Sequence, residues 1–370
     1  MKQANYKPNR VILCFMLVFT GGCVSAGQIE SKNAQQDAND GTLWYDCKLL
    51  QIDGKGWVDT ESFYDRLPEK ARKTAPTNVW ILSHNSAGIC VRFKTDAASV
   101  KVRWKLLNKN LALPHMPATG VSGVDLYARD KSGRWCFVKN GRPIAVSNVA
   151  SFNLTSAEEY MLYLPLYNGV KSVEIGLDKK STVSKPAAST SKPIVFYGTS
   201  ITQGACASRP GMAATAIVGR RLDIPVINLG FSGSAKMEPE MADLLSELDP
   251  AVYVIDCLWN MNNLDPNEVS QRAGPLVRKL RTAHPDTPIL LVEDSNFKNI
   301  TPTPKGYILR SIYEKLKKQD IKNLYFLSNE SMLGKDGEGT VDGCHPNDLG
   351  MMRQADVFIK ALLPILQRQK

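Results

Sequence analysis

The stretch Ile194-Val-Phe-Tyr-Gly-Thr-Ser-Ile201 decides the fold of the C-terminal half of this chain. An apolar, β-branched run that stops at Gly-Thr-Ser is typical of a buried strand that brings a hydroxyl group to the edge of a sheet. Ser200 is therefore a candidate nucleophile, although a serine here could equally cap the next helix. A serine nucleophile needs a general base, a group that orients the base, and donors for the developing oxyanion.

Downstream of this stretch, short apolar runs alternate with longer amphipathic ones. Strands are expected at 194–197, 226–229, 252–256, 289–293 and 324–327, and helices at 212–222, 239–248, 266–283, 304–318 and 349–367. This alternation predicts an α/β domain with a mostly parallel sheet and helices on both faces. In such folds, binding and catalytic groups gather at the carboxyl ends of the strands.

Upstream, the pattern is that of an all-β domain over residues 43–178. Short apolar runs at 79–82, 89–93, 100–104, 123–127 and 173–176 are separated by Gly, Asn, Asp and Ser turns, which predicts an antiparallel β-sandwich. Residues 27–42 are expected to be a loose polar leader. Residues 179–192 are rich in Ser, Thr, Lys and Pro and are expected to link the sandwich to the second domain at 193–370.

The first 26 residues have the pattern of a secretory signal peptide, with basic residues ahead of the apolar run 11–19 and small residues after it. The run is too short to span a bilayer. Thr20-Gly-Gly-Cys23 loosely resembles a lipoprotein box, in which Cys23 would carry the lipid. We therefore expect an exported protein that is periplasmic or secreted, and leave open an outer-membrane lipoprotein anchored through Cys23.

The charge and the cysteine spacing bear on which partners, disulfides and metal sites are expected. The formal net charge is +10, but the basic residues form no stripe interleaved with aromatic ones, so nucleic-acid binding is not expected. The cysteines beyond the signal region are too widely spaced for a disulfide scaffold or a Cys-x-x-Cys metal site. Cys206 and Cys344 lie close in sequence to the candidate site residues, and either a disulfide or two packed free thiols is consistent with this placement. No pattern indicates the oligomeric state.

His345 is the best candidate for a general base among the four histidines of the chain. His84 and His115 fall in the all-β domain, and His284 lies in a loop between a helix and a strand. Asp342 precedes His345 by three residues and can fold back to orient the imidazole, although Asp-x-x-His also occurs in ordinary polar loops. His345 has no second histidine at ligand spacing, so neither a metal nor a cofactor is expected.

Two further residues follow the second and third predicted strands. Gly233 can bring a backbone N–H close to a substrate oxygen, and Asn260 can offer its side-chain amide to the same point. Taken singly, each is equally well explained as a turn or cap residue. Trp259 offers a flat face for a sugar ring or packs in the core. Arg209 lies in a polar loop and is available to hydroxyl groups or an anionic sugar.

Taken together, Gly198-Thr-Ser200, Gly233, Asn260 and Asp342-x-x-His345 resemble the four blocks of the SGNH, or GDSL-type, serine hydrolases. The resemblance implies a three-layer, flavodoxin-like hydrolase domain. It also implies catalytic roles for Ser200, His345 and Asp342, and an oxyanion hole built from the amides of Ser200, Gly233 and Asn260.

The resemblance extends to the N-terminal domain and has two departures. Gly123-Val-Asp-Leu-Tyr127 resembles the GxDLY signature of a jelly-roll-like β-sandwich that is fused to such hydrolases in exported bacterial proteins. Thr199 replaces the aspartate of Gly-Asp-Ser, and Leu258-Trp-Asn-Met261 replaces the usual Gly-x-Asn-Asp. Neither departure removes a group assigned to the chemistry.

The resemblance implies a serine esterase that acts through an acyl-enzyme intermediate. The short polar loops 205–211 and 231–236 favour a short acyl group, above all an O-acetyl ester on a small or polymeric carbohydrate. The alternatives are a lysophospholipase or short-chain lipase of the same family, and a non-catalytic glycan-binding protein. An α/β-hydrolase is excluded because Thr202 stands where the Gly-x-Ser-x-Gly elbow requires glycine.

Overall fold

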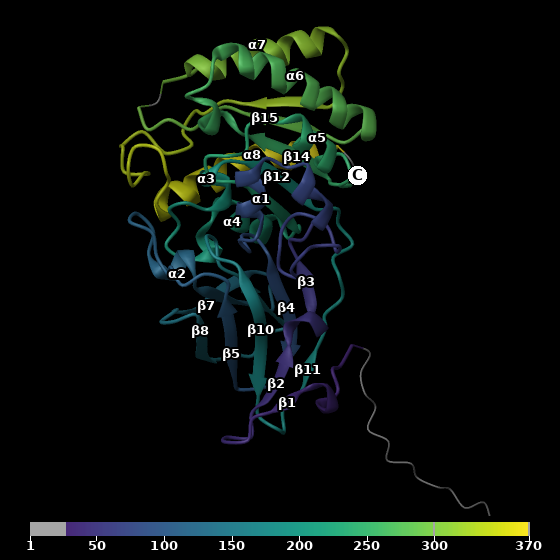
Figure 1. Ribbon diagram of the computed structural model, residues 1–370, viewed down its shortest axis with the longest axis vertical. Helices are drawn as coiled ribbons and strands as arrows, with labels where there is room; N and C mark the ends of the chain where they lie inside the picture. The colour runs from purple at the N-terminus through teal and green to yellow at the C-terminus, as the bar shows by residue number, and fades with distance from the viewer. Residues whose placement is uncertain (1–26, 299, 369–370) are drawn as a thin grey trace, which may run out of the picture.

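The computed structural model describes residues 27–298 and 300–368, so the predicted signal peptide lies outside the described residues. Two antiparallel sheets form one end of the molecule, and an α/β domain forms the other (Figure 1). Among the described helices, none has both the length and the apolar character needed to cross a membrane.

The N-terminal domain is a sandwich of two antiparallel sheets. The first contains, in spatial order, β1 (Gln35–Gln36), β2 (Leu43–Asp46), β10 (Val170–Leu177), β5 (Ser99–Leu106) and β8 (Ser147–Asn153). The second contains β11 (Val183–Ser184), β4 (Cys90–Thr95), β9 (Glu159–Tyr163), β6 (Val124–Arg129) and β7 (Trp135–Gly141), with β3 (Gln51–Asp53) paired to β4. The all-β prediction for this half is confirmed.

Alternation along the strands explains the core of the sandwich. In β5, Val100, Val102 and Trp104 point inward and are fully or almost fully buried, whereas the intervening serine, lysine and arginine residues face out. The same period of two recurs in the other long strand of this sheet, where Val173 and Ile175 of β10 join the core. Burial of these side chains drives the two sheets together.

The leader and the linker are more ordered than their composition suggests. Ile29 donates its backbone N–H to the carbonyl of Val183 at 2.9 Å, and β1 pairs with β2. Within the predicted linker, Val183 is fully buried and belongs to β11, which pairs with β4. The polar composition of the two segments does not indicate this order. Backbone hydrogen bonds hold both segments against sheet edges, and the linker adds the buried side chain of Val183.

The strand predicted at 79–82 was wrong. These residues lie in the helix α1 (Thr77–Ser83), where Val79 is fully buried against the second domain while Ile81 is 58% exposed. A run of four apolar residues fits both a helical and a strand period, so the pattern alone could not decide. Pro76 sits at the N-cap of this helix.

The second domain is built on a parallel sheet with the spatial order β13 (Val226–Gly230), β12 (Ile194–Gly198), β14 (Val252–Asp256), β15 (Ile289–Val292) and β16 (Leu324–Leu327). All four neighbouring pairs are parallel. This 2-1-3-4-5 order is the flavodoxin-like arrangement, which confirms the predicted fold class.

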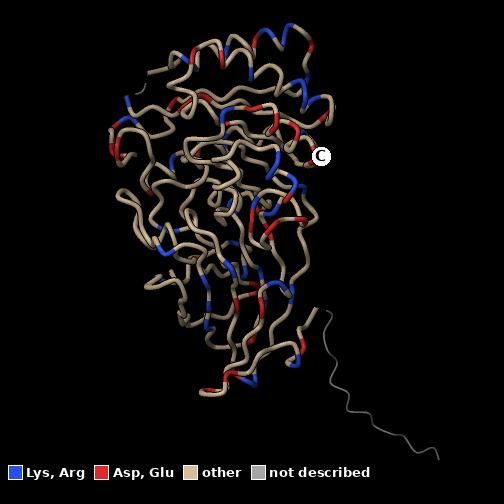
Figure 2. Tube along the Cα trace, in the orientation of Figure 1, with Lys and Arg blue, Asp and Glu red and all other residues tan. Residues whose placement is uncertain are grey.

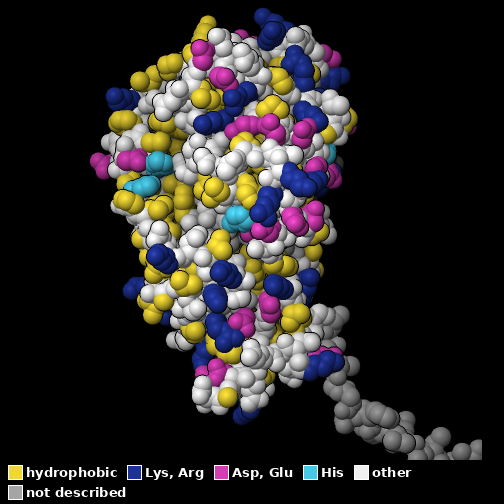
Figure 3. Space-filling view, in the orientation of Figure 1, with side chains coloured by type: hydrophobic (Ala, Val, Ile, Leu, Met, Phe, Trp, Pro, Cys, Tyr) yellow, Lys and Arg dark blue, Asp and Glu magenta, His cyan; other side chains and the backbone are white. Residues whose placement is uncertain are grey.

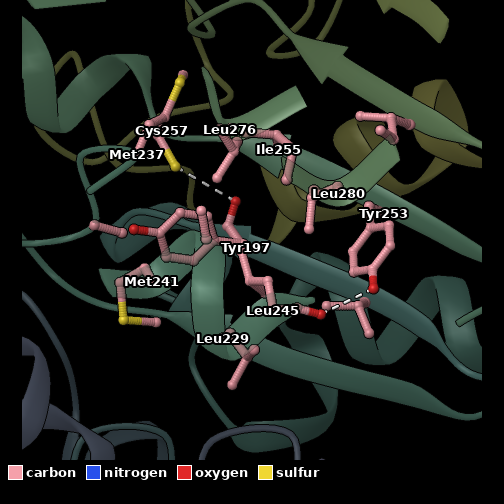
Figure 4. Close-up of a cluster of buried hydrophobic side chains, with 14 of the residues drawn as sticks. Tyr197, Leu229, Met237, Met241, Leu245, Tyr253, Ile255, Cys257, Leu276 and Leu280 are labelled. Atoms are coloured by element: carbon pink, nitrogen blue, oxygen red, sulfur yellow. Dashed lines mark hydrogen bonds between the residues drawn. The ribbon is translucent and has the colours of Figure 1, made fainter. Parts of the chain in front are cut away.

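Helices cover both faces of this sheet. The remaining helices are α2 (Ala118–Val121), α3 (Ser200–Gln203), α4 (Ala214–Leu222), α5 (Pro239–Leu245), α6 (Pro266–Ala283), α7 (Pro304–Lys318) and α8 (Asp348–Gln367). Ile194 and Phe196 of β12 pack with α4 and α8, and the alternating Val195 and Tyr197 pack with α5, α6 and α7. Figure 4 shows the second cluster, in which Tyr197 lies among leucine and methionine side chains.

The GxDLY stretch docks the sandwich onto the α/β domain. Asp125 is fully buried and accepts hydrogen bonds from Arg209 Nη1 at 2.9 Å and from the backbone N–H of Gly211 at 2.8 Å. The hydroxyl of Tyr127 accepts a second bond from Arg209 at 2.6 Å. A Cβ at Gly211 would lie 2.4 Å from the Tyr127 ring, so glycine is required for this approach.

A second contact between the domains is made by Arg66, which is 1% exposed. Its guanidinium donates to the carbonyls of Asn228 and Gly230 at the end of β13, at 3.1 and 2.7 Å, and lies over the ring of Phe231. Burial lowers the pKa of Arg66 to about 9, against the opposing influence of Tyr167 and Asp65. The cation thus remains charged at neutral pH and caps the strand that leads to Gly233.

The surface carries both signs of charge in mixture. Figure 2 shows Lys and Arg interleaved with Asp and Glu along both domains. On the face drawn in Figure 3, basic and acidic side chains alternate with small groups of hydrophobic ones. This is the pattern of an ordinary solvated surface.

Candidate active site

Ser200 sits at the carboxyl end of β12, as the first residue of α3. Thr199 is the N-cap, and its Oγ1 accepts a hydrogen bond from the backbone N–H of Ile201 at 3.3 Å. A Cβ at Gly198 would lie 2.2 Å from Oγ1 of Thr202, so the tight turn needs glycine at this position. Thr199, which stands at the place of the aspartate in Gly-Asp-Ser, therefore caps this helix and leaves the serine in place.

The structure brings Ser200, His345 and Asp342 together in one chain of hydrogen bonds. Ser200 Oγ lies 2.9 Å from Nε2 of His345, and His345 Nδ1 lies 2.7 Å from Oδ2 of Asp342. The other carboxylate oxygen of Asp342 accepts from the backbone N–H groups of Cys344 and His345. An ionised Asp342 selects the tautomer with a proton on Nδ1, which leaves the lone pair of Nε2 facing the serine hydroxyl.

The pKa of Asp342 supports this arrangement. Partial burial raises the pKa, but the hydrogen bonds from the His345 side chain and from the backbone outweigh burial and lower it to about 2. The carboxylate is consequently ionised throughout the neutral range. It can hold the imidazole in place and stabilise an imidazolium when one forms.

The nucleophile loop and the histidine loop are tied to one another. The backbone N–H of Cys206 donates to the carbonyl of Pro346 at 2.9 Å, and Asp348 accepts from the backbone N–H of Ser208 at 2.8 Å. Cys206 and Cys344 are both free thiols in the structure, so the pinning is done by these hydrogen bonds and not by a disulfide.

Gly233 and Ser200 offer backbone donors at the same edge of the sheet. Gly233 has φ of +64°, and a Cβ added there would meet nothing within 4 Å, so the residue faces open space. In the described part of the chain, neither the Ser200 nor the Gly233 N–H donates to a protein acceptor. Gln203 Oε1 holds this loop by accepting from the backbone N–H of Ser232 at 3.1 Å. Two unused N–H groups beside a serine nucleophile suit an oxyanion.

Asn260 has a different role from the one expected. Its Nδ2 donates to the carbonyls of Phe231 and Ala235, both at 3.0 Å, so both amide protons are used within the protein. These two residues flank Gly233. Asn260 therefore holds the loop that presents the Gly233 N–H, and it does not leave a free donor for the oxyanion in this structure.

The two expected substrate-binding residues are both engaged by the protein. Arg209 was predicted to face substrate, but its guanidinium binds Asp125 and Tyr127 of the sandwich and stacks 3.8 Å from the ring centroid of Phe137. The guanidinium is thus paired with a carboxylate 84 residues away in the sequence, and its contact with substrate stays a prediction. Trp259 is half-buried, with its indole N–H bonded to the carbonyl of Ser295 at 2.8 Å.

Residues of the sandwich also reach the site, which the sequence analysis did not foresee. The hydroxyl of Tyr167 donates to the carbonyl of Ser200 at 3.2 Å, and the ring centroid of His115 lies 5.4 Å from that of His345. In Figure 1 the segment before α2 rises from the sandwich toward the loop before α8. No short-range pattern links His115 to His345, which is 230 residues further along the chain.

A second histidine lies near His345 in space, although none stands at ligand spacing in the sequence. His115, Cys206 and His345 each offer one ligand atom, and these atoms all lie within 4.8 Å of one another. The second histidine comes from the other domain. The sequence spacing around His345 could not reveal His115, because the two histidines are 230 residues apart.

A buried carboxyl group lies beneath the nucleophile helix. Asp256 at the end of β14 accepts a hydrogen bond from Thr202 Oγ1 at 3.0 Å and is 8% exposed. Burial raises its pKa to about 7, opposed by the Thr202 bond, with a further increase from Asp294. Sequence analysis treated Asp256 only as the end of a strand.

Comparison with known proteins places this geometry in a family. Residues 191–363 match the model of the GDSL-like lipase/acylhydrolase family, and residues 42–183 match that of the GxDLY N-terminus of SGNH-hydrolase-type esterases. Among curated proteins, no match was found.

Three solved structures illustrate the likeness. A candidate GDSL-like lipase from Bacteroides ovatus is 35% identical, with a TM-score of 0.81 over 88% of this chain and 98% of that one. Salicylyl-acyltransferase SsfX3 from a tetracycline biosynthetic pathway is 18% identical, with a TM-score of 0.66 over 90% and 95% of the two chains. A family two carbohydrate esterase from Cellvibrio japonicus is 14% identical, with a TM-score of 0.54 over 77% and 90%.

The last two similarities show the fold alone, whereas the first is extensive enough in sequence and coverage to show kinship. The chain belongs to the GDSL-like lipase/acylhydrolase family of SGNH-type enzymes, with a GxDLY-type N-terminal domain, and is a carboxylic ester hydrolase.

Proposed function

We propose that this protein is an exported serine esterase that removes short acyl groups, foremost O-acetyl, from carbohydrate. The observation that carries the proposal is the chain of hydrogen bonds from Ser200 through His345 to Asp342, with separations of 2.9 and 2.7 Å. A serine oriented toward a neutral imidazole that is itself fixed by a carboxylate is the arrangement that acyl transfer requires.

The proposed reaction has two halves. His345 Nε2 takes the proton of Ser200 as its Oγ attacks the ester carbonyl, and Asp342 stabilises the imidazolium. The N–H groups of Ser200 and Gly233 receive the oxyanion, after which His345 returns the proton to the leaving alcohol. Water, deprotonated by the same imidazole, then attacks the acyl-enzyme and releases the acid and the free serine.

A short acyl group is supported by the loops around Ser200. A long acyl chain would need an apolar groove or a mobile apolar lid. The 205–211 loop is instead fastened at Cys206 to Pro346 and at Ser208 to Asp348. Ser200 itself is only 7% exposed, so a small group fits its surroundings best. The likeness in fold to a carbohydrate esterase agrees with a carbohydrate alcohol.

One observation favours a second candidate, a lipid-directed esterase. Phe297 is 37% exposed and would be 3.2 Å from a Cβ at Gly343, so an aromatic ring packs on the loop that carries His345. Val341 of the same loop is 49% exposed. Both exposed apolar side chains belong to or contact the loop that carries His345, where a longer acyl chain could pack against them.

The rates on p-nitrophenyl acetate, butyrate and octanoate decide between the two candidates. We expect kcat/KM to fall steeply from acetate to octanoate, and acetylated xylan or another acetylated polysaccharide to release acetate. A preference for octanoate or for lysophospholipid would replace the carbohydrate proposal by the lipid one. Ser200→Ala should abolish every activity while the circular dichroism and melting temperature stay unchanged; a folded Ser200→Ala protein with full activity would refute the mechanism.

Export is proposed from the first 26 residues. Cell fractionation of the full chain should find it outside the cytoplasm, and retention in the cytoplasm would refute export. Metabolic labelling with palmitate distinguishes the two products: labelling of the wild type that is lost in Cys23→Ala identifies a lipoprotein, and an unlabelled, shortened chain identifies ordinary signal cleavage.

A further inference from the structure

Three side chains from three separate segments meet beside the proposed nucleophile. His115 lies in the sandwich loop before α2, Cys206 lies in the loop after α3, and His345 precedes α8. Their ligand atoms lie within 4.8 Å of one another, and the two imidazole centroids are 5.4 Å apart. The esterase mechanism proposed above uses only His345 of the three.

The separations are close to those of a tetrahedral metal site. Zn–S and Zn–N bonds of about 2.3 and 2.0–2.1 Å place neighbouring ligand atoms roughly 3.3–3.6 Å apart, so the ligands must approach by at most about 1.5 Å. Cys206 is 5% exposed, and its backbone N–H is held by Pro346. His115 is exposed at the tip of a turn closed by two hydrogen bonds between Leu113 and Met116. Two ligands are thus fixed, and the third is free to rotate toward them.

The ligand chemistry selects one class of cation. Two imidazoles and a thiolate suit Zn²⁺ and related borderline-soft ions, whereas Mg²⁺ and Ca²⁺ prefer carboxylate and carbonyl oxygens. Asp342 engages Nδ1 of His345, which leaves Nε2 available and supplies the carboxylate–histidine support seen around metal-bound imidazoles. A fourth position stays open for water.

We propose that His115, Cys206 and His345 form a site for a Zn²⁺-class cation, and that the bound cation holds the esterase inactive. The inactivation rests on the proposed function, because Nε2 of His345 cannot bind a cation and accept the proton of Ser200 at once. On binding, the Cys206 thiol releases its proton to solvent and its sulfur donates an electron pair to the cation. No group changes oxidation state, and a chelator reverses the process.

Binding is tested without reference to activity. Co²⁺ titrated into the reduced full-length protein should produce the sulfur-to-cobalt charge-transfer band of a thiolate complex, with one ion per chain. The band should persist in Ser200→Ala, because the serine is not a ligand, and should disappear in Cys206→Ala. Absence of the band in the wild type, or its persistence in Cys206→Ala, would overturn the site whatever the fate of the esterase proposal.

Inhibition is tested with p-nitrophenyl acetate and Zn²⁺ alone. Each variant is compared with its own rate in the presence of a chelator, so a change in basal activity does not enter the comparison. His115→Ala and Cys206→Ala should each raise the Zn²⁺ concentration for half-inhibition by about 10–100-fold or more. Mutation of a residue that only supports a metal ligand already lowers metal affinity by this factor. Cys136→Ala is the matched control, because Cys136 is exposed on β7 and should leave inhibition unchanged. Equal sensitivity of all three variants and the wild type would refute the proposed switch.

Discussion

Replacing Arg66 by methionine should destabilise the protein and slow the enzyme together. The guanidinium donates to four backbone carbonyls, of Leu82, Asn85, Asn228 and Gly230, at 2.7–3.1 Å. Each buried carbonyl left without its partner costs about 1–3 kcal/mol, so the four together cost about 4–12 kcal/mol before any compensation. Relief of the desolvation that lowers the pKa of Arg66 offsets part of this. We therefore expect a net loss of about 2–4 kcal/mol in the free energy of unfolding.

This loss has two measurable consequences. The melting temperature should fall by about 4–16 °C, since 1 kcal/mol corresponds to about 2–4 °C for chains of 150–250 residues, the nearest size class. Asn228 and Gly230 end the strand that leads to Gly233, so misplacement of that loop should lower kcat for p-nitrophenyl acetate, by up to about 100-fold. KM should change less, because the acetyl ester has few other contacts to lose.

Arg72→Met is the matched control. Arg72 is exposed and lies 3.5 Å from Glu61, a surface pair that is worth about 0–1 kcal/mol. Circular dichroism melts and steady-state rates of both variants should be recorded in the same buffer. If Arg66→Met melts together with Arg72→Met and keeps the wild-type kcat, Arg66 does not support the loop and the reasoning fails.

Three further predictions test the site. Burial raises the pKa of Asp256 to about 7. Between about pH 4 and pH 7 the folded state therefore keeps a proton on Asp256, whereas the unfolded state has lost it. The free energy of unfolding should consequently decrease as the pH rises from about 4 to about 7. Asp256→Asn should remove this slope in urea melts at pH 5 and pH 8, and an unchanged slope would assign it elsewhere. Asn260→Ala should lower kcat through displacement of Gly233, and a crystal structure with the 231–235 loop unmoved would contradict that route. Asp342→Ala should reduce kcat/KM less than His345→Ala, because water can partly replace an orienting carboxylate but not the base; equal losses would argue against this division of roles.

The fold of the second domain was predictable because its signals are local. The strands begin where expected, and their ends differ by at most one residue, since each is a short, buried apolar run bounded by turn residues. The helices agree almost as well: α6 and α7 have the predicted bounds, while α5 ends three residues earlier, at Leu245. The sandwich was harder, because runs such as 79–82 are too short to show a period.

The residues of the candidate site likewise differ in whether local sequence signals identify them. Ser200, Gly233 and the Asp342–His345 pair follow strand ends or sit within a single loop, so the sheet topology and short motifs bring them together. The pairing of Arg209 could not be foreseen, because its partner Asp125 lies in another domain. A polar loop residue looks free in sequence until the fold supplies its counter-ion.

His115 shows the limit of motif reasoning most clearly, because its significance depends on how one domain is docked on another. That docking is itself specified by side chains: Asp125 holds Arg209, and Arg66 caps the end of β13. Tyr167, from the same domain, bonds to the carbonyl of Ser200. The sandwich therefore supplies buried polar contacts to Ser200 and to the strand that leads to the Gly233 loop, and it packs against the candidate site.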